Sequence, residues 1–142
     1  MPGTPKYTNT VYEKANHLYG LNVTWKKCLQ DQKVYVVEGN VDVLQTYQAG
    51  IHNVVGMLGS AFSFTQLCLL SRFVKKIVFV PDPDKAGKGL LEKLQKAIPK
   101  KFYDSDIEFF YIALPIGQDP DNYFKAHSKE EFLSLPENRL VL

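Results

Sequence analysis

Apolar runs typical of strands alternate with segments of helical spacing along most of this chain of 142 residues. Four such runs cover residues 33–39, 52–58, 75–81 and 106–114. Repetition of strand, helix and strand favours parallel strands that are joined by right-handed crossovers. The sequence therefore predicts an α/β, Rossmann-like fold with about four mainly parallel strands and helices on both faces of the sheet.

Local signals mark where several helices begin and end. Val41, Leu44 and Gln48 follow helical spacing, and Gly50 is expected to stop that helix as its C′ residue. Two further helices are expected to begin at capping boxes, formed by Ser63 with Gln66 and by Ser128 with Glu131.

Carboxylates gather where three of the expected strands end. In parallel sheets, functional groups sit beyond the carboxyl ends of the strands, so these acids are expected at one edge. Oxygen ligands without histidine or cysteine nearby favour a hard cation such as Mg²⁺ or Mn²⁺. The candidate metal ligands are Glu38, Asp42, Asp82, Asp84, Asp119 and Asp121.

Each acid taken alone also has a simpler explanation. Asp84 is placed to cap a helix that begins at Lys85, and Asp42 would favour the N-terminus of its own helix through the dipole. Besides a cation, the partner of such an acid can be a lysine or only water. A shared cation is favoured because it explains the three acidic clusters together.

Composition narrows the class of protein. An apolar fraction of 45% supports a real core, and a net charge of +2 does not by itself indicate nucleic acid. No segment approaches the roughly 18 apolar residues of a membrane span, so we expect a cytoplasmic protein without a membrane partner. Cys28 and Cys68 lack the spacing of zinc ligands.

Three stretches of the sequence resemble the signatures of the TOPRIM fold, which bacterial-type primases, topoisomerases of types IA and II and some nucleases share. They are VVEGNVDVL (36–44), VFVPDPDKAG (78–87) and LPIGQDPDNYF (114–124). The DKAG wording and the upstream segment TPKYTNT...YEKANHLYGL are similar to DnaG-type DNA primases of bacteria or phages. Asn40, Val41, Ser60 and Pro83 depart from the usual wording, but no departure removes a carboxylate.

The resemblance implies a nucleotidyltransferase, a DNA-dependent RNA polymerase that makes RNA primers for DNA replication. It implies Mg²⁺ or Mn²⁺ as cofactor, and a single-stranded DNA template, ribonucleoside triphosphates and the RNA primer as partners. Glu38 would be catalytic as well as a metal ligand. Lys6, Lys14 and Lys85 would contact phosphates, although an isolated lysine is more often only a solvated surface charge.

The same resemblance implies a domain organisation. Residues 1–31 would be a basic, partly helical lead-in from the polymerase core, residues 32–127 the TOPRIM domain, and residues 128–142 a C-terminal helix and tail. Full primases of this type carry a zinc-binding domain and a helicase-binding domain as well. We therefore expect the replicative helicase to bind elsewhere, little activity from this chain alone, and a place at the replisome.

Two other functions keep the same acids. A TOPRIM nuclease would use them to cut strands, and a non-catalytic TOPRIM module would only bind nucleic acid. Full retention of the carboxylates argues against the second, and the DKAG wording favours the primase over both.

Overall fold

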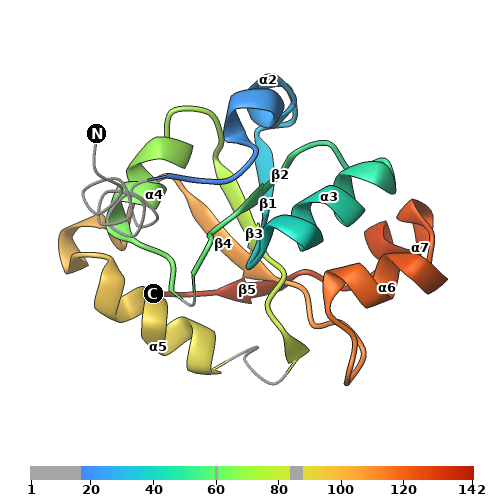
Figure 1. Cartoon of the computed structure of the whole chain (residues 1–142). Coiled ribbons are helices and arrows are strands. Elements are labelled where there is room, and N and C mark those ends of the chain that lie inside the picture. Colours follow the sequence, from blue (N-terminus) through green and yellow to red (C-terminus); the bar gives the residue numbers. More distant parts are fainter. Residues whose placement is uncertain (1–16, 60, 84–87) are drawn as a thin grey trace, which may run out of the picture.

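The computed structural model describes residues 17–59, 61–83 and 88–142, and its elements alternate along the chain as expected (Figure 1). The strands are β1 (Lys33–Val37), β2 (Val54–Gly56), β3 (Lys76–Phe79), β4 (Glu108–Tyr111) and β5 (Asn138–Leu140). The helices are α2 (Leu21–Asp31), α3 (Asn40–Gln48), α4 (Phe64–Leu70), α5 (Lys88–Ala97), α6 (Pro120–Ala126) and α7 (Lys129–Leu133), with a 3₁₀ turn η2 (Lys100–Phe102).

The sheet has five strands in the order β2-β1-β3-β4-β5. The first four are parallel to their neighbours, whereas β5 pairs with β4 in the antiparallel sense. The α/β class and the mainly parallel sheet are confirmed, and the sheet has one strand more than the roughly four expected. The missed strand covers three residues just after Pro136, which is too short for an alternating pattern to show in the sequence.

Two hydrophobic cores lie on the two faces of the sheet. Val34 and Val36 of β1 face one core, and Tyr35 and Val37 face the other. Helices cover both faces (Figure 1), which is why β1 is apolar at consecutive positions.

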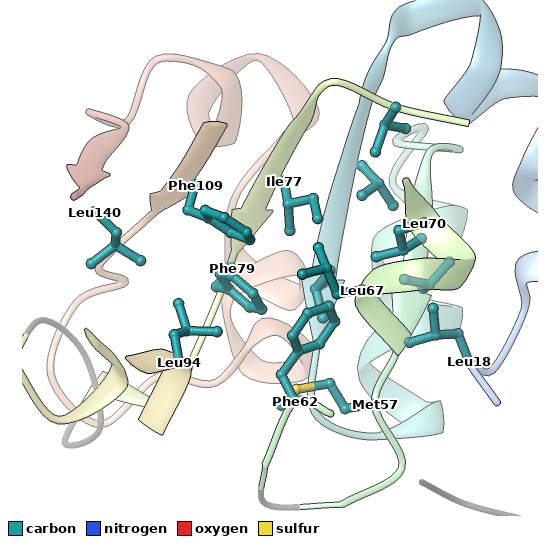
Figure 2. Close-up of a cluster of buried hydrophobic side chains, with 14 of the residues drawn as sticks. Leu18, Met57, Phe62, Leu67, Leu70, Ile77, Phe79, Leu94, Phe109 and Leu140 are labelled. Carbon is teal, nitrogen blue, oxygen red and sulfur yellow. The ribbon is translucent and has the colours of Figure 1, made fainter. Parts of the chain in front are cut away.

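The first core gathers the sheet, α4 and α5. Figure 2 shows Leu67 and Leu70 of α4 and Leu94 of α5 among the side chains of this core. Phe79 contributes the centre of its aromatic cluster, with Phe62 edge-on at 5.1 Å between ring centroids. The packing of this core therefore supports the carboxyl ends of β1 and β3.

The second core gathers α3, α6 and α7 over the opposite face. It contains Val43 of α3, Tyr123 of α6 and Phe132 of α7. The helix expected around Val41 and Leu44 is confirmed, but these two side chains are about half exposed, and α3 buries its neighbouring face instead.

The expected helix boundaries are confirmed at three places. The Ser63 and Gln66 capping box opens α4, and the Ser128 and Glu131 box opens α7. Gly50 follows the C-cap of α3 with a φ of 103°, a left-handed conformation that favours glycine.

The last fifteen residues contribute to both cores. Phe132 packs in the second core and Leu140 in the first. We therefore propose that residues 128–142, expected as a terminal helix and tail, belong to the same folded unit as the sheet.

Candidate metal site at the carboxyl edge of the sheet

Glu38 and Asp82 leave neighbouring parallel strands at the same edge. Val36 of β1 lies opposite Phe79 of β3, so Glu38 and Asp82 follow these paired residues by two and three positions. The carbonyl of Glu38 accepts a 2.9 Å hydrogen bond from the N–H of Leu58, which fixes the backbone where β1 ends. The structure thus places both residues where the parallel sheet predicts them.

Asp42 connects two helices at this edge. Its Oδ2 accepts a long 3.4 Å hydrogen bond from the N–H of Gly39, the N-cap of its own helix α3. Its Oδ1 accepts a 3.2 Å hydrogen bond from the N–H of Asp121 in α6. Asp42 therefore has a structural role at two helix N-termini, beyond the simple dipole interaction considered from the sequence.

Asp119 and Asp121 lie at the start of α6. Asp119 is the N-cap, and its Oδ1 accepts a 2.8 Å hydrogen bond from the N–H of Asn122. Asp121 follows Pro120 and pairs with Lys125 at 3.4 Å, one turn later. Both residues reach the edge through α6. The cap bond uses Oδ1 of Asp119, and the ion pair with Lys125 uses Oδ2 of Asp121.

The charges of these acids act on one another. Burial is the main cause that raises the pKa of Asp42 above its ordinary value, and the negative charges of Asp119 and Asp82 raise it further. The two backbone hydrogen bonds lower it again without cancelling the rise. Acids from α3, α6 and the end of β3 are therefore close enough to repel one another.

The donor set of this edge fits a divalent cation in chemistry. All the donors are carboxylate oxygens, which Mg²⁺ and Mn²⁺ prefer, and a cation would offset both the burial and the neighbouring negative charges that raise the pKa of Asp42. Among the residues that the structure describes, no group of three or more acids, histidines or cysteines lies close enough together to hold a metal ion. Asp84 lies outside the described residues, as do the phosphate-contact candidates Lys6, Lys14 and Lys85.

A narrow pocket adjoins Glu38 and contains a lysine that the sequence analysis did not select. Glu38, Pro81 and Lys93 all line it, together with apolar side chains of the first core. Lys93 lies on α5 next to the buried Leu94. The amphipathic spacing of α5 is visible in the sequence. Which of its polar residues lies next to the strand ends depends on how the helix packs on the sheet, and the sequence does not show this.

A Rossmann-like sheet with functional groups beyond its carboxyl edge is typical of α/β proteins whose ligands bind at the ends of their strands. The model of the Toprim-like family matches residues 35–124, and this chain belongs to that family. The expected TOPRIM fold is thus confirmed.

The curated relatives of this chain are DNA primases. It is 36% identical over 142 residues to the DNA primase of Clostridium acetobutylicum and 35% identical over 136 residues to that of Aquifex aeolicus. These alignments cover 97% and 93% of this chain but only 23% and 26% of the two relatives. The chain thus spans about a quarter of the length of the relatives it matches.

Solved primase structures share the fold. The zinc-binding and RNA polymerase domains of the Aquifex aeolicus primase superpose with a TM-score of 0.70 at 32% identity, covering 87% of this chain and 31% of that one. A DnaG primase catalytic domain bound to single-stranded DNA superposes with a TM-score of 0.72 at 28% identity, covering 85% of this chain and 39% of that one. The resemblance to DnaG-type primases seen in the motifs is confirmed.

Proposed function

We propose that this chain is the TOPRIM part of a DNA primase, an enzyme that makes RNA primers on a DNA template by nucleotidyl transfer. The observation that carries the proposal is the acidic edge, where Asp42 accepts a hydrogen bond from the start of α6 and lies near the negative charges of Asp82 and Asp119. The family match and the primase relatives support this assignment.

The candidate residues would divide the work. Asp82 and Asp84 would hold Mg²⁺ or Mn²⁺, with Asp42, Asp119 and Asp121 completing or tuning the site. The cation would neutralise phosphate charge and bring the reacting oxygens together. Glu38, at the end of β1, would help to hold the cation or accept the proton of the attacking 3′-hydroxyl.

The lysines would act on the substrates rather than on the cation. Lys6, Lys14 and Lys85 would contact phosphates of the template or the ribonucleoside triphosphates without reading their sequence. Lys93 joins this proposal, because it lines the pocket next to Glu38. The growing RNA primer would be the remaining partner in the site.

The whole enzyme would need more than this region. We propose that the replicative helicase is bound by a part of the primase outside this chain, and that the 142 residues alone make primers poorly. The enzyme would act in the cytoplasm at the replisome. Among the described residues, no helix is long and apolar enough to cross a membrane.

Manganese titration followed by NMR tests the metal site. Sub-stoichiometric Mn²⁺ should broaden the amide signals of Gly39, Asp82 and Asp121 before those of Lys33 and Asn53 at the other end of the sheet. Asp82→Asn should weaken this broadening, because it removes an anionic ligand. Asp104→Asn, an exposed acid in the turn before β4, is the matched control and should change nothing.

Broadening that spares the carboxyl edge would overturn the metal assignment. The reaction itself is tested in the complete gene product with a single-stranded template and labelled ribonucleotides. Template-directed RNA products that disappear in Asp82→Asn support the primase. Strand cleavage without synthesis would instead assign the nuclease, and template binding without either would assign the non-catalytic module.

A further inference from the structure

The amino-terminal end of the sheet carries a hollow of about 400 Å³ with a basic lining. Residues from α2, β1, the turn before β2 and α7 line it together. Its charged lining consists of three lysines (Lys27, Lys33 and Lys129) and Asp31, which gives a formal charge of +2 with His52 neutral. A hollow of this size has the volume of a small-ligand site.

This hollow is separate from the acidic edge. Lys33 begins β1 and Glu38 follows its end, so the five residues of the strand separate the two by about 16 Å at the usual strand rise. The two ends of one parallel sheet therefore carry opposite charge.

The lysines of the hollow differ in how far they are neutralised. Lys27 pairs with Asp31 at 3.2 Å, and Lys33 pairs with Glu137, which also pairs with Lys76. Within the part of the chain that the structure describes, no carboxylate pairs with Lys129. Positive charge thus remains available for an anion that enters the hollow.

The backbone around Gly50 positions Lys129. The Cδ atom of Lys129 lies 3.2 Å from where a Cβ atom of Gly50 would be, so the aliphatic part of the lysine passes closely over this glycine. On the same turn, the ring of His52 stacks on Tyr47 with 4.3 Å between centroids. Both side chains are exposed at the rim of the hollow that they line.

We propose that this hollow binds a phosphate group, either of a free nucleotide or of a nucleic-acid strand. Lysine ammonium groups are point-charge donors that suit phosphate oxygens, and Lys129 supplies a charge that no carboxylate of the described residues neutralises. His52 and Lys33 approach the same space from two further elements. The inference does not rest on the proposed function, because it uses no metal and none of the acidic edge.

Binding of pyrophosphate in the presence of a chelator tests the site. Excess EDTA prevents metal ions from bridging phosphate to the acidic edge. Pyrophosphate should shift the amide signals of Gly50, His52, Asn53 and Lys129 in a saturable way. Lys129→Gln should weaken the affinity about tenfold, the usual effect of losing one hydrogen bond to a charged group.

Lys26→Gln is the matched control, since it removes the same charge next to Lys27 from a residue that does not line the hollow. This variant should change the affinity for pyrophosphate less than twofold, because the effect of an exposed charge outside the site is screened by solvent and salt. Equal weakening by both variants, or shifts that appear equally at the lysines of α5, would overturn the site, as would binding that does not saturate.

Two further titrations in chelator identify the source of the phosphate. ATP that binds more tightly than an oligothymidylate assigns the hollow to free nucleotides, and the reverse order assigns it to a strand. Either order supports the phosphate site when Lys129→Gln weakens it. A loss of primer synthesis in Asp82→Asn leaves this result untouched, so the two proposals fail separately.

Discussion

The two ends of the sheet differ in what surrounds a half-buried carboxylate. At the amino end, Glu137 lies between Lys33 and Lys76. Burial alone would raise the pKa of Glu137, but the hydrogen bonds from Lys33 and Lys76 outweigh it and lower the pKa below its ordinary value. At the carboxyl end, burial raises the pKa of Asp42, and the negative charges of Asp119 and Asp82 raise it further.

This difference separates a structural ion pair from a candidate functional site. Glu137 is stabilised in its charged form by the fold itself, and it joins the segment before β5 to the starts of β1 and β3. Asp42 is destabilised in its charged form, and the fold retains that cost at the edge where α/β sheets bind their ligands. Each of the following changes should affect one end and spare the other.

The largest effect is expected from Glu38→Gln in the complete gene product. The change keeps size and hydrogen bonding but removes the charge next to the proposed cation. The single-turnover rate of phosphodiester formation should fall by about 10²–10⁴-fold, the usual effect of losing acid–base catalysis. Template affinity at fixed salt should stay nearly the same, and an unchanged rate would show that Glu38 is only an acid at a strand end.

Glu137→Gln should have the next largest effect, on stability rather than on rate. It leaves Lys33 and Lys76 facing each other without a negative charge, so the free energy of unfolding at pH 7 should fall by about 1–2 kcal/mol, between the values for exposed and buried pairs. Urea unfolding measures it, with the exposed Glu92→Gln as control. An equal loss in both variants would contradict the pairing.

The pH dependence of that loss has a definite sign. The pKa of Glu137 is lower in the folded chain than in the unfolded chain, so its stabilisation is present above the unfolded value of the pKa. It should disappear as the pH falls through the lowered folded value. The stabilities of the parent and Glu137→Gln should therefore converge in acid, and a constant difference would argue for a role of Glu137 other than charge.

Asp82→Asn should produce the smallest change, and in the opposite direction. In chelator it removes one of the charges that repel Asp42, so the free energy of unfolding should rise by roughly 0.2–0.5 kcal/mol, as for an exposed charge pair. Mn²⁺ should raise the melting temperature of the parent more than that of the variant. A clear loss of stability in chelator would instead assign a structural role to Asp82.

The positions of Glu38 and Asp82 at the carboxyl edge could be predicted because they depend only on neighbouring residues in the sequence. Glu38 directly follows β1 and Asp82 follows β3 by three residues, and parallel strands bring such positions together without further information. The three motifs also indicated the family, and the match over residues 35–124 confirms it. The helix caps at Ser63 and Ser128 were readable for the same reason, since each lies within four residues.

Contacts between distant residues were not predictable in this way. Asp42 and Asp121 are separated by 79 positions, and Lys33 and Glu137 by 104. Nothing in the local pattern of either residue indicates its partner. The strand β5 was missed for a related reason, because its three residues become a strand only through pairing with β4.

The carboxyl pKa of Asp42, measured by carbon-detected NMR in chelator and in saturating Mg²⁺, tests the central claim most directly. Without metal, the pKa should lie above its ordinary value, because of burial and the charges of Asp119 and Asp82, and it should decrease in Asp82→Asn. A raised folded pKa means that ionised Asp42 lowers stability above that pKa, and that this cost disappears as the pH falls through it. Mg²⁺ should keep the carboxylate ionised to lower pH. An Asp42 pKa that is ordinary in chelator and unmoved by Mg²⁺ would contradict a cation site at this edge.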